Sequence, residues 1–228
     1  DHGEGRYVFM STGKGTVKKV PLEQFARPRP SGIRAIEFND DDVLIEAAIT
    51  DGERDIILVN SNGKVTRFVE TEVRPMGRNA RGVRGIRLKE STESVVAMII
   101  VNDDATLLLA CEHGFGKRTS VAEFPRKGRG AMGVIGIQTS DRNGAVVGAA
   151  QVTDEDDLLL ITNAGTMVRT PCSDISVLGR ITQGVTLIRL SDNEVLVRVN
   201  AVSEPSSNFA DTYGFEKQDT GSESEHAQ

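Results

Sequence analysis

The sequence predicts an all-β fold, a propeller-like array of four-stranded blades of about 50 residues each. Two families of glycines carry this prediction, because both recur with the same period. One family, spaced by 50, 51 and 51 residues, comprises Gly32, Gly82, Gly133 and Gly184. The other, spaced by 48, 51 and 51 residues, comprises Gly15, Gly63, Gly114 and Gly165. A third observation is that no stretch shows helical periodicity with caps, so the repeating unit is predicted to consist of strands.

Each unit is predicted to hold four strands, and the second unit illustrates them in order. Residues 56–59 are an apolar run rich in β-branched side chains, and residues 61–63 carry the Asn-Gly signal of a tight hairpin turn. Residues 64–68 alternate between polar and apolar side chains, as expected of a half-buried strand. After a longer connection, residues 82–88 and 94–101 are the third and fourth predicted strands.

Charge composition divides the chain into two parts. The 228 residues include 27 bases and 33 acids, which gives a formal net charge of −6. Residues 204–228 hold six of those acids and one base, and their polar composition predicts an acidic disordered tail. The body, residues 1–203, therefore carries 26 bases and 27 acids, and we assign it to the array of about four repeats.

Composition also excludes several classes of protein. No apolar run approaches the roughly 18 residues of a membrane-spanning helix, and two cysteines are too few for a disulfide scaffold. The first residues are polar and acidic rather than a signal peptide, so we expect a cytoplasmic protein with no membrane partner. Because the chain does not begin with Met, we expect a fragment or a processed product.

Basic residues lie in register with the repeat. Two repeat positions are basic in several units: Lys19, Arg67, Arg118 and Arg169 share the first, and Arg78, Arg129 and Arg180 share the second. A base repeated from blade to blade would form a row along a curved rim, which suits the phosphate backbone of duplex DNA. The alternative interpretation is that these are the ordinary cations of solvated strands. The candidate DNA-binding residues are Lys14, Lys18, Lys19, Arg27, Arg29, Lys64, Arg67, Arg74, Arg78, Arg81, Lys117, Arg118, Arg126, Lys127, Arg129, Arg169 and Arg180.

No motif indicates catalysis, a cofactor or a metal. Residues 128–133 match the spacing G-x-G-x-x-G, but a strand and not a helix is predicted to follow, so a dinucleotide site is not expected. No Gly-Lys pair is followed by Ser or Thr, which excludes a Walker A loop. Of the three histidines, only His113 lies away from the termini, which leaves no set for a metal site or a catalytic triad. We also expect no sequence-specific readout, because no recognition helix is predicted.

Four segments resemble the C-terminal domain of bacterial DNA gyrase A. They are Tyr7-Val-Phe-Met-Ser-Thr-Gly-Lys-Gly-Thr-Val-Lys-Lys19, Val73-Arg-Pro-Met-Gly-Arg-Asn-Ala-Arg-Gly-Val-Arg-Gly-Ile-Arg87, Gly114-Phe-Gly-Lys-Arg-Thr119 and Gly179-Arg-Ile-Thr-Gln-Gly-Val185. The resemblance implies a six-bladed β-pinwheel of Greek-key blades in which neighbours exchange strands, and an acidic tail also fits it. It implies that a basic rim wraps duplex DNA and so supports negative supercoiling by the ATP-dependent holoenzyme.

The same resemblance implies that this domain is not itself catalytic. The family's strand-passage tyrosine lies in another domain, and its ATPase lies in the other gyrase protein. The implied partners are duplex DNA, the remainder of gyrase A, and gyrase B in the heterotetramer, with a nucleoid-associated location and no cofactor.

One departure from the family keeps alternatives open. The family's first-blade heptad, Gln-Arg-Arg-Gly-Gly-Lys-Gly, is absent, so the array is expected to begin in the second blade or later, without the N-terminal blades. The C-terminal domain of the corresponding topoisomerase IV protein, the one related to gyrase A, is therefore an alternative. A protein-binding propeller of the regulator-of-chromosome-condensation type, with a similar period and glycine content, is another.

Overall fold

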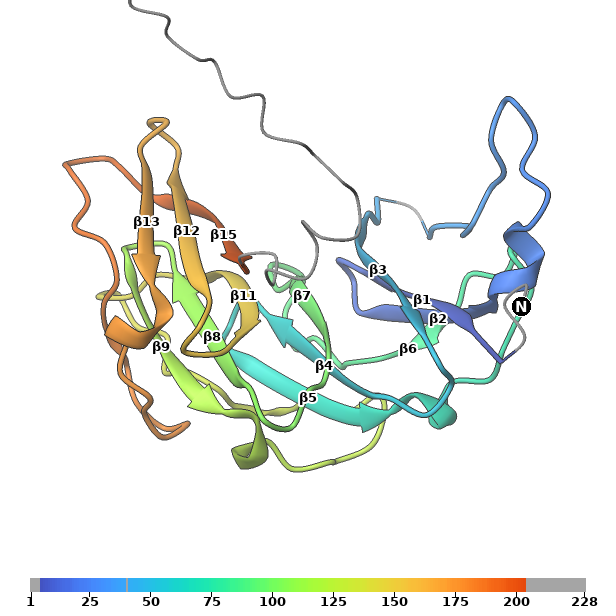
Figure 1. The fold of residues 1–228 in the computed structure, drawn as a ribbon, viewed down its shortest axis with the longest axis horizontal. Coiled ribbons are helices and arrows are strands. Elements are labelled where there is room, and N and C mark those ends of the chain that lie inside the picture. The colour runs from blue at the N-terminus through green and yellow to red at the C-terminus, as the bar shows by residue number, and fades with distance from the viewer. Residues whose placement is uncertain (1–4, 40, 204–228) are drawn as a thin grey trace, which may run out of the picture.

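The structure is a computed structural model that describes residues 5–39 and 41–203, and it arranges the four repeats side by side in an open arc (Figure 1). Each repeat contributes a hairpin and one long strand to its own blade. The first blade contains β1 (Tyr7–Thr12), β2 (Thr16–Pro21) and β3 (Leu44–Thr50), and the second contains β4 (Asp55–Asn60), β5 (Lys64–Val69) and β7 (Val95–Ile100). The third contains β8 (Thr106–Cys111), β9 (Phe115–Ser120) and β11 (Val146–Val152), and the fourth contains β12 (Asp157–Thr162), β13 (Met167–Pro171) and β15 (Leu196–Val202).

Short elements complete the repeats. A 3-10 helix follows each hairpin, namely η1 (Leu22–Phe25), η2 (Glu70–Glu72), η3 (Val121–Glu123) and η4 (Cys172–Asp174). The remaining strands have two residues each, namely β6 (Val83–Arg84), β10 (Val134–Ile135) and β14 (Val185–Thr186). None of the helices in the described residues is long and apolar enough to cross a membrane.

Neighbouring blades exchange strands through these two-residue elements. The sheet orders are β3-β1-β2-β6, β10-β5-β4-β7, β11-β8-β9-β14 and β13-β12-β15. Strands β6, β10 and β14 come from the second, third and fourth repeats, yet each pairs antiparallel with the hairpin of the preceding blade. In each of the first three sheets the donated strand forms one edge, and β3, β7 or β11 forms the other. Together with β15, an edge strand of the fourth sheet, these three strands lie toward the middle of the arc (Figure 1). The all-β array of antiparallel blades is therefore confirmed.

The third strand of each unit is shorter than the sequence predicts. The prediction places it at residues 82–88, but only Val83 and Arg84 pair with β2. The chain then leaves the sheet, because the amides of Gly85 and Ile86 both donate to the carbonyl oxygen of Gly15, at 2.7 and 3.3 Å. A Cβ on Gly85 would lie 2.6 Å from a methyl carbon of Val17, so this close approach requires glycine.

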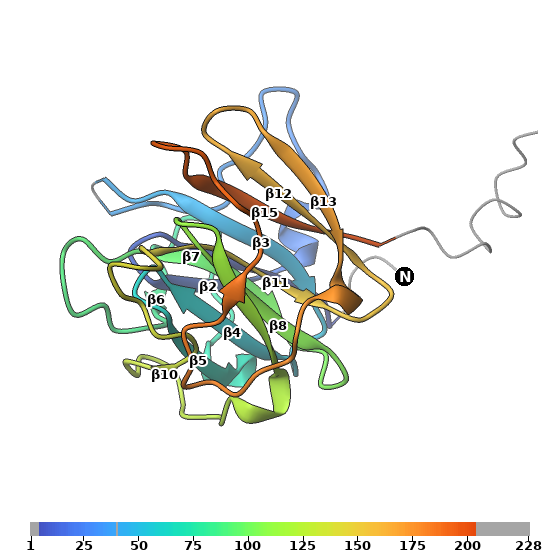
Figure 2. The same cartoon turned by 90° about the vertical axis from the view of Figure 1, so that its left-hand side faces the viewer.

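Three of the four hydrophobic clusters of the described residues lie between neighbouring blades, whose strands overlap in the view of Figure 2, and the fourth, around Met10, lies within the first repeat. Phe9 of the first blade and Phe68 of the second share one cluster, with ring centroids 6.4 Å apart. Val65 and Leu107 belong to a second cluster between blades two and three, and Leu108 and Leu158 belong to a third between blades three and four. Neighbouring blades thus bury most of their apolar side chains by stacking on one another, as in other repeat proteins.

The two ends of the arc lack a neighbour among the described residues. The fourth sheet has three strands, and Met167 on its edge strand β13 is 61% exposed, whereas its equivalent Val17 is fully buried. At the other end, Gly32 has the positive φ of its repeat equivalents, but no atom lies within 4 Å of a Cβ placed there. The predicted acidic tail, residues 204–228, lies outside the described residues.

Candidate nucleic-acid interface

Four of the candidate bases occupy one repeat position, on the second strand of each hairpin. In the first three blades this side chain reaches across the joint to the next blade. Each donates to the backbone carbonyl oxygen of the first residue of the next 3-10 helix: Lys19 to Glu70 at 3.0 Å, Arg67 to Val121 at 3.3 Å, and Arg118 to Cys172 at 2.7 Å. We call these three contacts the joint clamps. Each of these carbonyl oxygens also accepts the backbone N–H three residues further along its own 3-10 helix, so the clamp adds a second, charged donor from the preceding blade.

Acidic side chains complete the clamps. Arg67 pairs with Asp55 of its own hairpin and with Asp103, both at 2.7 Å. Burial alone would lower the pKa of Arg67, but the hydrogen bonds to Asp55 and Asp103 outweigh it and raise the pKa above its usual value. Arg118 is 3% exposed and pairs with Asp154 at 2.7 Å. These guanidinium groups are thus committed to protein partners.

Arg169 occupies the same position in the fourth blade and has a different environment. Its Nε pairs with Asp157, as Arg67 pairs with Asp55, but no following blade is present in residues 5–39 and 41–203. Its side chain is 51% exposed as a result. Arg169 therefore shows what this position looks like without the joint.

Two of the candidate lysines are fully buried inside joints. Lys117 donates from Nζ to the carbonyl oxygens of Gly179 and Arg180 and to the hydroxyl of Thr182, with Nζ to oxygen distances of 2.7, 2.5 and 3.0 Å. Its burial lowers the pKa of Lys117 to about 8. Lys18 donates in the same way to the carbonyl oxygens of Ala35, at 2.9 Å, and Arg78. All three donors of such an ammonium group can be used by the protein.

Arg78, Arg129 and Arg180 share a third structural role. Each is half-buried and donates from Nη1 to a carbonyl oxygen of the preceding repeat: Arg78 to Arg34 at 3.2 Å, Arg129 to Arg84 at 2.7 Å, and Arg180 to Ile135 at 3.1 Å. The acceptors are themselves repeat equivalents, spaced by 50 and 51 residues. These arginines therefore fix each rim loop to the segment that the previous repeat donates.

The remaining candidates lie at or near the surface. Lys64 is half-buried on β5, and the exposed members are Lys14, Arg27, Arg29, Arg74, Arg81, Arg126 and Lys127. Two of them bond to acids, Arg81 to Glu37 at 3.2 Å and Arg126 to Asp55 at 2.7 Å. Both remain more than half exposed, so their cationic groups are accessible from solvent.

Nine of the described bases outside the candidate set are exposed, and four of them lie in the connections of the first two repeats: Arg34, Arg84, Arg87 and Lys89. The signal that identifies three of them is present in the sequence, because residues 73–89 contain six bases and no acid. Arg84 lies on the donated strand β6, which forms one edge of the first sheet. The exposed bases therefore concentrate in the connections that follow the hairpins and on the donated segments.

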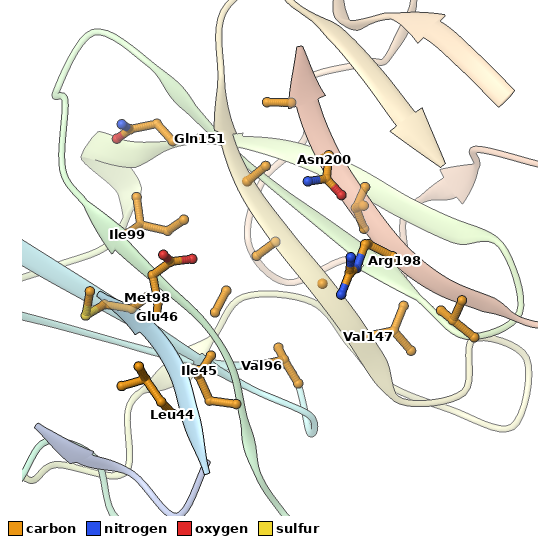
Figure 3. A pocket seen from close by; sticks show the side chains of 17 residues that line it. Leu44, Ile45, Glu46, Val96, Met98, Ile99, Val147, Gln151, Arg198 and Asn200 are labelled. Carbon is orange, nitrogen blue, oxygen red and sulfur yellow. The ribbon is translucent and has the colours of Figure 1, made fainter. Parts of the chain in front are cut away.

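The inner face of the arc has a different character. Strands β3, β7, β11 and β15 line a cavity of about 580 Å³ at its centre (Figure 3). Its lining includes two charged side chains of opposite sign, Glu46 and Arg198, among apolar and amide groups. This face offers no row of cations to a polyanion, whereas the outer rim does.

The described residues contain no cluster of three or more His, Cys, Asp or Glu side chains that could hold a metal ion. The two cysteines are buried and unpaired, and burial raises the pKa of Cys111 to about 12 and that of Cys172 to about 11. Both thiols therefore stay protonated at neutral pH.

Comparison with known proteins identifies the repeat family. A family described as "DNA gyrase C-terminal domain, beta-propeller" matches residues 6–51, 54–102, 105–153 and 156–203. The DNA gyrase A protein of Pseudomonas aeruginosa is 52% identical over 89% of this chain, and that of Escherichia coli is 50% identical over 89%. The chain spans 22% and 23% of the length of these two relatives.

Solved structures agree on the architecture. The C-terminal domain of a DNA topoisomerase IV has a TM-score of 0.83 at 25% identity, over 89% of this chain and 64% of that one. A DNA gyrase A C-terminal domain has a TM-score of 0.78 at 26% identity, over 88% and 67%. With four family matches that coincide with the four blades, the chain belongs to the DNA gyrase C-terminal domain family, a β-pinwheel found in one of the proteins of a type II topoisomerase.

Proposed function

We propose that this chain is the DNA-binding and DNA-wrapping part of a gyrase A protein, and that duplex DNA lies along its outer rim. The observation that carries the proposal is the division of charge between the two faces. Exposed bases gather on the connections and donated segments of the rim, while the central cavity has one charge of each sign. A duplex that follows this curved row of cations must bend, because the bases are spread along an arc.

In this proposal the basic residues of the rim and of the joints bind or support DNA and catalyse no reaction. The exposed rim bases contact phosphates, and the joint clamps keep the blades at fixed angles so that the rim stays curved. Strand passage and ATP hydrolysis belong to the remainder of gyrase A and to gyrase B, which we propose as partners in a nucleoid-associated, cytoplasmic holoenzyme. Relatives named as gyrase A proteins are about 50% identical, which favours gyrase over topoisomerase IV.

Equilibrium binding to duplex DNA across a salt series tests this proposal. If about six phosphates are neutralised, log K falls against log salt with a slope near roughly −5, and unrelated sequences bind with similar affinity. The rim variant Arg74→Ala/Arg81→Ala reduces the slope, whereas the control Arg198→Ala in the central cavity leaves it unchanged. A slope near zero, or a strong preference for one short site, contradicts the proposal.

A further inference from the structure

We infer that the DNA path over the rim is one-sided: the duplex is held most strongly by residues 73–89 of the second repeat and leaves the rim before residues 175–184 of the fourth. The inference rests on the proposed function and concerns which part of the rim the duplex touches. Equivalent segments of the repeats can be compared residue by residue, because the spacing of 51 residues is constant from the second repeat onward.

The basic charge of the rim declines from the second repeat to the fourth. The equivalent segments 73–89, 124–140 and 175–191 contain six, three and two bases, with no acid in any of them. One base of each segment, Arg78, Arg129 or Arg180, is used to fix the rim loop to a carbonyl group. That leaves five, two and one bases for a ligand. Since each phosphate contact contributes separately to affinity, the first of these segments holds the duplex most strongly.

One position that loses its charge becomes apolar and remains exposed, and an exposed apolar side chain lies near it. Val177 stands where the third repeat has Arg126, and its side chain is 52% exposed. Ile181 follows Arg180 in the same loop and is 62% exposed. Neither side chain offers a donor to a phosphate oxygen, so a duplex that followed this loop would desolvate its phosphates without compensation.

Exposed acids lie beside the fourth blade, as they do beside the third, where Asp103 and Asp104 hold the equivalent positions. Asp154, which pairs with Arg118, is 77% exposed, and Glu155 beside it is also exposed. Together with Val177 they line a cavity of about 470 Å³ at this joint. The edge of the third blade also attracts phosphate weakly, because its donated strand β14 has Thr186 at the position where β6 has Arg84.

Arg87 and Arg189 provide a matched pair for the test. They occupy the same repeat position, 102 residues apart, both are exposed, and neither side chain takes part in a joint clamp. Two variants, Arg87→Cys and Arg189→Cys, carry a photo-crosslinker on the new thiol. The native Cys111 and Cys172 are fully buried with raised pKa values, so they do not compete for the reagent.

Each labelled protein is bound to linear duplex DNA, irradiated and analysed for covalent adducts. Crosslinking from position 87 that exceeds that from position 189 by at least about tenfold supports the inference. Equal yields, or a higher yield from position 189, overturn it, as does the absence of adducts from both positions while binding persists. Loss of all duplex binding by the unmodified chain would instead contradict the proposed function, so the two failures are distinguishable.

Discussion

Arg118 donates from Nη1 to the carbonyl oxygen of Cys172 at 2.7 Å, across the joint between the third and fourth blades. The same guanidinium group pairs with Asp154 and is almost fully buried. A residue type that usually marks a DNA-binding surface is here part of the frame that holds two blades together.

Removal of this clamp is expected to destabilise the array. Arg118→Ala removes the charged donor to the Cys172 carbonyl and the Thr106 hydroxyl together with the ion pair to Asp154, and we expect a loss of about 2–4 kcal/mol. Denaturant unfolding monitored by circular dichroism measures it. Arg169→Ala is the control at the equivalent, half-exposed position and should cost within about 0.5 kcal/mol. Equal losses in the two variants would contradict the clamp.

Substitutions at two turn glycines measure the cost of a left-handed backbone separately from the cost of crowding at a joint. Gly63 has φ +75° and a Cβ there would lie 2.5 Å from the carbonyl oxygen of Ile137, whereas Gly165 has φ +84° and open space around it. Gly165→Ala should therefore cost about 1 kcal/mol for the left-handed backbone alone. Gly63→Ala should cost at least about 2 kcal/mol more, because the donated segment must move. Thermal unfolding of both variants checks this difference, and similar melting temperatures would show that the joint tolerates a Cβ.

The lowered pKa of Lys117, at the joint between blades three and four, predicts that the unfolding free energy depends on pH. Its folded-state pKa is lowered by burial to about 8, below the usual 10.5, so between these values the unfolded chain binds more protons than the folded chain. Stability from this residue therefore rises as the pH rises through that window, since the cost of a buried charge is relieved. The unfolding free energy of the parent relative to Lys117→Met, measured from pH 7 to pH 10.5, should increase. If the difference in unfolding free energy between the two proteins does not change with pH, the pKa of Lys117 is not lowered in the folded state.

The blade array is predictable from the sequence because its glycines mark turns that the backbone requires. Gly63 and Gly165 both have positive φ in the hairpin turn, as the repeat predicts. The length of the third strand was not predictable, because the chain leaves the sheet where Gly85 packs against the preceding blade. That contact joins residues about 70 positions apart, and no local pattern records it.

The sequence likewise did not indicate which basic side chains are buried in the joints between blades and which are exposed to solvent. Alternation along β2 predicts that Lys18 and Lys19 point to opposite faces, one of them solvated. Both are buried, because the next blade covers one side of the hairpin and the rim loop covers the other. Composition does not distinguish a lysine inside a cage of carbonyl groups from one in solvent. The acid-free run of residues 73–89, in contrast, does correspond to exposed bases such as Arg84 and Arg87.

The most direct test of the wrapping proposal is the linking number of DNA that is closed while the protein is bound. Nicked circular DNA is ligated at increasing ratios of protein to DNA, and the topoisomers are resolved after deproteinisation. The account predicts a shift that grows with bound protein and is strongly reduced by Arg74→Ala/Arg81→Ala/Arg84→Ala/Arg87→Ala, while Arg198→Ala leaves it unchanged. Saturated binding with no change in linking number would contradict it.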